Sequence, residues 1–268
     1  MDYSYNNIKN IYEQVLKAGM LSPPEDVIGC WLLFDSLPKI DRFLELGSYI
    51  GGGLTVFNQL LKETRHQPVQ FTGVDHLSFI GARAKQANGA WYTDHFSRCL
   101  STDELQSLSQ VQTPNEMTDW IKQRCWHISQ LDIDLESLVS EADLGSTVYN
   151  IIHHDYGDSV EENLTTMQRC IPLLSDSGVY IVDDWCTGAP LRTWATFVVQ
   201  QQGLLFPFMW GKNKVFFAKS AAVGQSIVKR ILANPNCNQR LFKTMPGSEY
   251  FGKNYTTIRM HWQAIQWS

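Results

Sequence analysis

Residues 43–57 read FLELGSYIGGGLTVF, and this stretch decides the fold. Apolar residues at 43, 44 and 46 predict a buried strand, glycines fill the turn at 47–53, and apolar residues at 54–57 predict the start of a helix. Glycine lets the backbone turn sharply and approach a ligand, because it has no Cβ. The first turn of the helix points free N–H groups into the same space. The stretch therefore predicts a nucleotide or nucleoside pocket on an open α/β sheet.

The spacing of the glycines excludes two common phosphate-binding motifs. The dinucleotide motif G-x-G-x-x-G fails because Tyr49 stands two residues after Gly47. The phosphate loop G-x-x-x-x-G-K-[ST] fails because no lysine follows the glycines. The pattern that remains is E-x-G-x-x-x-G-G, starting at Glu45. The alternative interpretation is a turn that only packs a strand against a helix.

Length and composition favour one domain that spans residues 1–268. The chain is 44% hydrophobic, with a net charge of −5, which argues against a nucleic-acid partner. No apolar run approaches about 20 residues, so we expect no membrane span. The N-terminus lacks a signal pattern, and the six cysteines are widely spaced without a C-x-x-C pair. We therefore expect a reduced, cytoplasmic protein.

Apolar, β-branched runs alternate with helical patterns along the chain. We expect strands at 42–46, 70–75, 126–131, 148–154 and 178–183, and helices at 7–20, 25–36 and 160–171. The run LLFPFMWGKNKVFFAK at 204–219 predicts a closing hairpin. The expected fold is α/β and doubly wound (Rossmann-like). Its seven-stranded sheet is mostly parallel with one antiparallel strand, and helices cover both faces.

Three segments lie outside this minimal core of residues 39–219. Residues 1–38 predict N-terminal helices. Residues 77–125 form an aromatic insertion that we interpret as a lid, or as a helical pair that extends the core. Residues 220–268 are aromatic and carry six Lys or Arg but one acid. This extension suits a site cover, a homodimer contact or an acidic carrier protein, and the plainer alternative is a solvated basic tail.

Carboxylates stand at the predicted ends of four strands. Asp75 suits the two ribose hydroxyls of a nucleoside or the N-cap of a helix. Asp132 suits an adenine or, again, a helix cap. Asp155 ends one strand, and Asp183 and Asp184 end the next. Three neighbouring carboxylates repel one another unless a cation neutralises them, so we predict a Mg²⁺ or similar site. The alternative is that these acids cap helices or bind the amine of a cofactor.

Three motifs together resemble a known family. ELGSYIGGGLTVF, IIHHDYGD and LLSDSGVYIVDDW, all within residues 40–219, are similar to segments of the catechol-type, divalent-metal-dependent O-methyltransferases. That family includes enzymes that tailor sugars, macrolides and other natural products. The resemblance implies S-adenosyl-L-methionine (SAM) and Mg²⁺ as cofactors. It also implies methyl transfer to a hydroxyl of a small molecule.

The resemblance assigns roles by position. Residues at and after the glycine turn would hold SAM, and the strand-end acids would hold the metal. For SAM these are Glu45, Gly47, Tyr49, Gly51, Gly53, Asp75, His76 and Tyr156, beside the Asp132 noted above. For the metal they are Asp155, Asp183 and Asp184.

The chain departs from this family at the general base. The catechol-type enzymes place a lysine three residues after the acid that ends their fourth strand, and this chain has Asp158 there. The candidates for the base are Asp158, His153 and His154, because carboxylates and histidines accept protons near neutral pH. A second functional hypothesis is a protein of the same fold that binds SAM without methyl transfer. A third is that it uses its acids for decarboxylation or hydrolysis.

Overall fold

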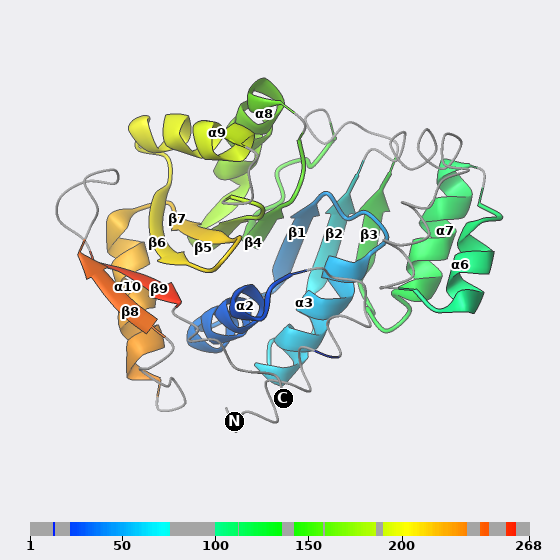
Figure 1. Ribbon diagram of the computed structural model, residues 1–268, viewed down its shortest axis with the longest axis horizontal. Coiled ribbons are helices and arrows are strands. Elements are labelled where there is room, and N and C mark those ends of the chain that lie inside the picture. Colours follow the sequence, from blue (N-terminus) through cyan, green and yellow to red (C-terminus); the bar gives the residue numbers. More distant parts are fainter. Residues whose placement is uncertain are drawn as a thin grey trace.

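The structure is a computed structural model, and it describes residues 13, 22–75, 100–111, 113–135, 142–157, 159–185, 190–234, 242–246 and 256–260. One sheet runs through the molecule in the strand order β3-β2-β1-β4-β5-β7-β6-β9-β8 (Figure 1). Its strands are β1 Arg42–Leu46, β2 Gln70–Val74, β3 Leu131–Asp134, β4 Tyr149–His154, β5 Leu174–Val182, β6 Phe206–Trp210, β7 Val215–Ala218, β8 Phe242–Pro246 and β9 Thr256–Met260.

The first seven strands confirm the predicted doubly wound sheet. Strands β3, β2, β1, β4 and β5 pair in parallel, and β7 lies antiparallel between β5 and β6. The predicted hairpin at 204–219 is therefore present. Two strands that we did not predict extend the sheet, since β9 pairs in parallel with β6, and β8 is antiparallel to β9. Both come from the C-terminal extension.

Two predicted strand boundaries are wrong. The third strand starts at Leu131 instead of 126, because residues 125–128 close a turn in which Ile128 N donates to Cys125 O at 2.8 Å. Trp126 in this turn is 81% exposed, whereas an indole that faced the helices covering the sheet would be buried. The fifth strand starts at Leu174, four residues before the predicted start.

Helices cover both faces of the sheet. They are α2 Pro24–Ser36, α3 Gly52–Glu63, α6 Thr102–Leu108, α7 Pro114–Arg124, α8 Val160–Cys170, α9 Pro190–Gln201 and α10 Ala221–Ala233, with a 3₁₀ turn η1 at Ile171–Leu173. The helices predicted at 25–36 and 160–171 are confirmed. The helix predicted at 7–20 lies outside the described residues except for residue 13. Among the described residues, no helix is long and apolar enough to cross a membrane.

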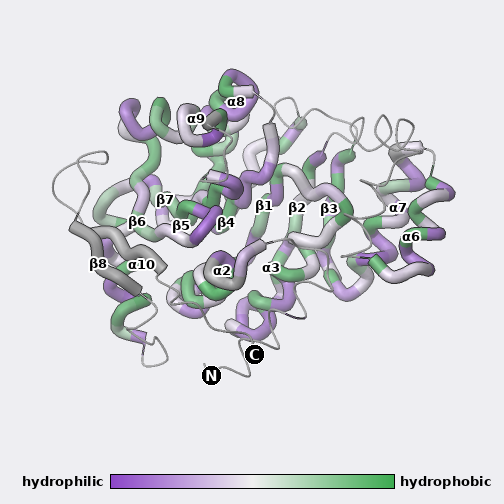
Figure 2. The backbone as a smooth tube through the Cα atoms, viewed as in Figure 1, coloured by the Kyte–Doolittle hydropathy of each residue, from purple (hydrophilic) through white to green (hydrophobic). Residues whose placement is uncertain are grey.

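Alternation along the strands builds two cores, one on each face. In β5, Val179 and Ile181 join the core beneath α2, α3, α7 and α10, whereas Tyr180 and Val182 join the core beneath α8 and α9. Figure 2 shows hydrophobic stretches in these strands and hydrophilic residues on the outward turns of α6 and α7. Burying both faces explains why the strands read as continuous apolar runs.

The described part of the predicted lid extends the core. Helices α6 and α7 lie at the β3 edge of the sheet in Figure 1. Both begin with a capping box, in which Ser101 and Thr113 accept from the N–H three residues on. Trp120 and Ile121 of α7 are buried in the core next to α3. This supports the helical-pair interpretation for residues 100–125, and residues 76–99 lie outside the described part.

Candidate active site

The strand ends of the central sheet meet at one edge. The amides of Gly47, Asp75, Asp155 and Asp183 each donate to the carbonyl of a residue at the end of a neighbouring strand, at 2.8–2.9 Å. These four bonds link the carboxyl ends of β1, β2, β3, β4 and β5. Ligands of open α/β sheets bind outside such strand ends. The edge therefore gathers most of the predicted site residues.

The glycine turn is tightly constrained. Gly47 has φ +90°, and a Cβ there would lie 2.2 Å from the main-chain oxygen of Asp155. Gly51 has φ +78° and stands at the N-cap of α3 without a capping side chain. A Cβ on Gly53 would lie 2.0 Å from Glu45 Oε1. These positions need glycine for conformation and for space.

The turn and Asp75 fit the parts of a SAM molecule. No acidic side chain occupies the first turn of α3, so its N–H groups suit a carboxylate. Asp75 is buried at the end of β2, and its Oδ2 accepts from Tyr49 N at 2.5 Å. This contact ties the acid predicted for the ribose to the glycine turn. Tyr49 has φ +46°, which a non-glycine residue seldom adopts.

Glu45 lies under the turn. It is buried against Gly53, and its Oε1 is 3.4 Å from His153 Nδ1. Its Oε2 is buried without a hydrogen-bond partner in the described part of the chain. Burial raises the pKa of Glu45, and His153 opposes that rise. A cation such as the SAM ammonium group is the partner that an orphaned carboxylate oxygen would accept.

His154, which the sequence suggests as a general base, lies in the protein interior. It is fully buried, its Nε2 lies 2.9 Å from Tyr156 O and its Nδ1 lies 2.8 Å from Tyr180 Oη. Because a carbonyl only accepts, Nε2 carries the proton and Nδ1 accepts from the tyrosine hydroxyl. Burial and the nearby Arg192 lower the pKa of His154 to about 3. Neither nitrogen is open to an acceptor molecule.

His153, the other histidine that the sequence suggests as a base, is also enclosed. Its ring packs edge-on against Phe57, with centroids 4.8 Å apart. Its Nε2 lies 3.1 Å from Lys214 Nζ. An ammonium group only donates, so Nε2 accepts from Lys214 and the ring proton faces Glu45. His153 thus links the acid under the glycine turn to Lys214.

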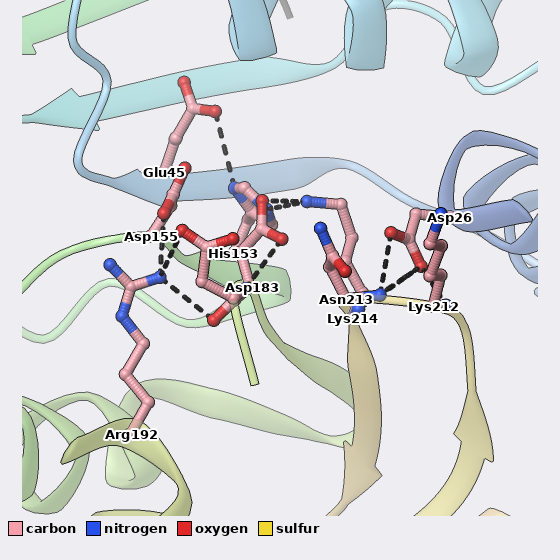
Figure 3. Close-up of polar contacts among 10 residues, drawn as sticks. Asp26, Glu45, His153, Asp155, Asp183, Arg192, Lys212, Asn213 and Lys214 are labelled. Atoms are coloured by element: carbon pink, nitrogen blue, oxygen red, sulfur yellow. Dashed lines mark hydrogen bonds and ion pairs between the residues drawn. The ribbon is translucent and has the colours of Figure 1, made fainter. Parts of the chain in front are cut away.

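Lys214 is the buried partner of Asp183. Its side chain is inaccessible to solvent, and Nζ contacts Asp183 Oδ2 directly (Figure 3). Burial opposes ionisation of Asp183, but Lys214 and His153 outweigh it and hold the pKa of Asp183 far below its usual value. For Lys214, the effect of burial is outweighed by Asp183, which raises the pKa of the ammonium group.

The turn before Lys214 is fixed from α2. Asp26 is fully buried and accepts from the amides of Lys212, Asn213 and Lys214 at 2.7–3.2 Å (Figure 3). A Cβ on Gly211 would lie 1.9 Å from Asp26 Oδ1, so the turn needs glycine for this approach. Burial raises the pKa of Asp26 to about 6, although Lys214 and these amides oppose the rise. The N-terminal part of the chain thus positions the hairpin that supplies Lys214.

Arg192 of α9 is the second cation at this edge. Its Nη1 donates to Asp155 Oδ1 at 2.8 Å and to Asp183 O at 2.9 Å. Asp184 Oδ2 is 3.9 Å away. Burial and the charge of Asp183 raise the pKa of Asp155 to about 6, and Arg192 opposes that rise. The side chain of Asp155 is 37% exposed to solvent, so a bound molecule can reach it.

The three acids predicted to bind Mg²⁺ do not fit a metal in this arrangement. Both carboxylate oxygens of Asp183 are engaged, Oδ2 by Lys214 and Oδ1 by Asp184 N at 2.8 Å. Asp155 Oδ1 is engaged by Arg192. Within the described residues, no group of three His, Cys, Asp or Glu side chains is placed to hold a metal ion. The carboxylates do come together as predicted, but protein cations neutralise them.

The remaining predicted residues divide into three groups. Tyr156 follows β4 and lies beside Gly47, and its predicted contact with the cofactor stays a prediction. Asp132 is exposed two residues before the end of β3, and Asp134 stands at the strand end instead, because the strand starts later than predicted. His76 and Asp158 lie outside the described residues.

Sequence reasoning missed Arg192 and Lys214. Lys214 is set opposite Asp183 by the antiparallel register of the structure, which pairs Val182 with Val215 and continues by one residue. That register was not fixed by the sequence pattern alone. For Arg192 we find no signal, because α9 follows a connection whose geometry the sequence did not predict.

Comparisons with known proteins agree with this fold. No protein-family model matches the chain, and no curated protein matches its sequence. Among solved structures, the O-methyltransferase NovP is 15% identical, with 80% of this chain and 94% of that chain covered and a TM-score of 0.51. CalS11, a TDP-rhamnose 3′-O-methyltransferase of calicheamicin biosynthesis, is 13% identical, with 81% and 87% covered and a TM-score of 0.49. The likeness to NovP shows that the chain has the Rossmann-like fold of class I methyltransferases.

Proposed function

We propose that the protein is a SAM-dependent O-methyltransferase that acts on a hydroxyl of a small molecule. One observation carries the proposal. The constrained glycine turn, Asp75 and the partly exposed Asp155 lie at linked ends of β1, β2 and β4. These positions support a nucleoside-binding half next to a carboxylate that can take a proton. The likeness of the fold to NovP supports the proposal.

The chain supplies the groups that such a reaction needs. When bound, SAM would supply a methyl group whose carbon–sulfur bond breaks as the acceptor oxygen bonds to the carbon. Asp75 would accept from the ribose hydroxyls, and the N–H groups of α3 would hold the carboxylate. These contacts fix the orientation of the reactants, which supplies much of the catalysis in transfer reactions.

Asp155 is the general base in this proposal. Its Oδ1 is held by Arg192, and its Oδ2 has no protein partner in the described part of the chain. A carboxylate with a pKa near 6 is ionised at neutral pH and can accept the proton of the acceptor hydroxyl at Oδ2. Arg192 keeps the carboxylate oriented. Asp155 thus replaces the histidines that the sequence suggested.

We propose a hydroxylated natural product as the class of the methyl acceptor. The aromatic character of the predicted insertion suits a bulky or partly apolar acceptor, and the basic extension suits delivery on an acidic carrier protein. A homodimer that uses the extension is proposed on the same grounds. Mg²⁺ is not part of the proposed reaction, because the acids are engaged by Arg192 and Lys214.

A two-step experiment tests the function. Thermal melting is measured first with S-adenosylhomocysteine, and with NAD as the control. A ligand at about 100 times its Kd adds roughly 2.7 kcal/mol, which is several degrees for a chain of this size. Methyl transfer from labelled SAM is then measured on a panel of hydroxylated acceptors. Melting that does not respond to S-adenosylhomocysteine contradicts the proposal.

A further inference from the structure

The acids at the ends of β4 and β5 are unusual because cations of the same chain surround them. Figure 3 shows Arg192 and Lys214 approaching Asp183 from opposite sides. Arg192 contacts the carboxylate of Asp155 and the main chain of Asp183, and Lys214 contacts the carboxylate of Asp183. Three carboxylates and two full positive charges thus share one strand-end cluster, made of Asp155, Asp183, Asp184, Arg192 and Lys214.

A divalent cation in this cluster would have to displace a buried group. Hard cations such as Mg²⁺ and Mn²⁺ take several oxygen ligands at about 2.0–2.2 Å. Asp183 offers no unengaged oxygen, and Lys214, which holds one of them, is 1% exposed. Removing one partner of a buried pair leaves the other charge uncompensated, at a cost of several kcal/mol. The buried lysine is in turn fixed through its own amide by Asp26.

Arg192 differs from Lys214 in having donors to spare. Its Nη1 donates both hydrogen bonds, to Asp155 and to the main chain of Asp183. Its Nη2 and Nε have no partner within the described residues. A guanidinium presents five N–H donors and stays charged at all relevant pH values. The unused donors lie beside the exposed Asp155, which is where an acceptor oxygen would bind.

We propose that Arg192 and Lys214 take the place of a divalent cation in this cluster, so that the strand-end acids bind no metal and Arg192 stabilises the acceptor oxygen. Lys214 is a positioning residue that keeps Asp183 ionised and fixed. The role of Arg192 toward the acceptor rests on the proposed methyl transfer. The replacement of a metal ion by Arg192 and Lys214 is argued only from their contacts with Asp155 and Asp183.

Binding of Mn²⁺ tests the charge replacement without an acceptor. Free Mn²⁺ is followed by electron paramagnetic resonance in the full-length protein, with and without S-adenosylhomocysteine. Wild type is compared with Arg192→Gln, with the charge-preserving Arg192→Lys, and with Arg230→Gln as a control for the loss of one exposed arginine. Arg230 lies on α10, and its hydrogen bonds to described residues go to Ser226 of its own helix.

The proposal expects no stoichiometric Mn²⁺ binding by wild type, Arg192→Lys or Arg230→Gln. Arg192→Gln leaves the acids with one neutralising charge fewer, so it should bind Mn²⁺ at least about tenfold more tightly than the control. Circular dichroism verifies that the variant is folded. Stoichiometric binding by wild type that Asp155→Asn abolishes overturns the proposal, and this arm needs no Arg192 variant. A folded Arg192→Gln that binds no better than Arg230→Gln also overturns it.

The two proposals fail in distinguishable ways. If S-adenosylhomocysteine does not raise the melting temperature, the methyltransferase function is contradicted, regardless of whether the protein binds Mn²⁺. A protein that binds S-adenosylhomocysteine and also binds Mn²⁺ through Asp155 keeps the function and contradicts the charge replacement. Once an acceptor is known, methyl transfer that survives exhaustive chelation but falls in Arg192→Gln supports the assigned role of Arg192.

Discussion

The two halves of the site edge are built differently. The cofactor half, formed by the ends of β1 and β2, consists of residues that lie close together in sequence, from Glu45 to Gly53, with Asp75 joined to them by its hydrogen bond from Tyr49 N. The acceptor half, formed by the ends of β4 and β5, depends on contacts between Asp183 and Lys214, 31 residues apart, and between Asp155 and Arg192, 37 residues apart. One half is thus specified locally and the other by long-range pairing.

The two halves also differ in how the charges of their carboxylates are compensated. In the cofactor half, the N–H groups at the start of α3 and the carboxylates of Glu45 and Asp75 suit a ligand of mixed charge. In the acceptor half, side chains of the same chain already neutralise the acids. A half that is neutralised internally contributes to the stability of the fold. A half that is left open contributes mainly to binding.

The largest effect should come from Lys214. We expect Lys214→Met to lower the free energy of unfolding by about 3–5 kcal/mol, because it leaves Asp183 buried without its counter-charge. Urea denaturation measures the change. Lys219→Met is the matched control. Lys219 follows β7 of the same hairpin, pairs with the exposed Asp176 at 3.7 Å and donates to Leu174 O, and these two contacts together are worth at most about 2 kcal/mol. The double variant Lys214→Met/Asp183→Asn should recover part of the loss, and an equal loss in both lysine variants would contradict the account.

In the cofactor half, the same type of change should affect binding instead. We expect Asp75→Asn to weaken S-adenosylhomocysteine binding about 10–100-fold, because a charged acceptor of the ribose hydroxyls becomes neutral. The free energy of unfolding should change little, since the amide can still accept from Tyr49 N. Asp143→Asn serves as a control, because its carboxylate also accepts from a backbone amide but is exposed and distant from the turn. Equal affinities in the two variants would argue against the ribose role.

His154 should make the free energy of unfolding depend measurably on pH. Its pKa is lowered from 6.5 to about 3 in the folded protein. Between these pH values the unfolded chain therefore binds a proton at His154 that the folded chain does not bind. Stability therefore falls as the pH falls through this window, by about 2 kcal/mol at about pH 5. Urea titrations at about pH 7.5 and about pH 5 should show a smaller loss in His154→Gln than in wild type. An unchanged pH dependence in a folded variant would show that His154 ionises normally.

The same contrast between local patterns and long-range contacts explains which parts of the fold the sequence predicts. The glycine turn, β1, β2 and β4 depend on contiguous patterns, and their predicted positions match the structure within one residue. The start of β3 was predicted wrongly because WHISQL is apolar enough for a strand, whereas its first residues form a turn after α7. Apolarity alone does not separate a strand from an apolar turn.

The site shows the same limit. The sequence placed Asp155 and Asp183 together, because parallel strands end at one edge. It did not show what neutralises them, because a metal and a pair of remote cations satisfy the same charge argument. It also favoured His153 and His154 as bases, although alternation along β4 buries one on each face of the sheet. Register and burial decide these questions, and neither is local.

The smallest effect should come from the turn before β3. We expect Trp126→Ser to change the free energy of unfolding by no more than about 0.5 kcal/mol, because the indole is almost fully exposed. Urea denaturation measures this, and S-adenosylhomocysteine affinity should stay the same. A loss of several kcal/mol would mean that Trp126 is buried in a strand, as the sequence pattern first suggested.

Calorimetric titration of S-adenosylhomocysteine into the wild-type protein tests the central claim most directly. It is carried out once in the presence of a chelator and once with excess Mg²⁺. The account predicts one binding site per chain with the same affinity in both, because the cofactor half is complete and the acceptor half is neutralised by Arg192 and Lys214. The absence of binding in both titrations would contradict the assignment of the glycine turn to SAM.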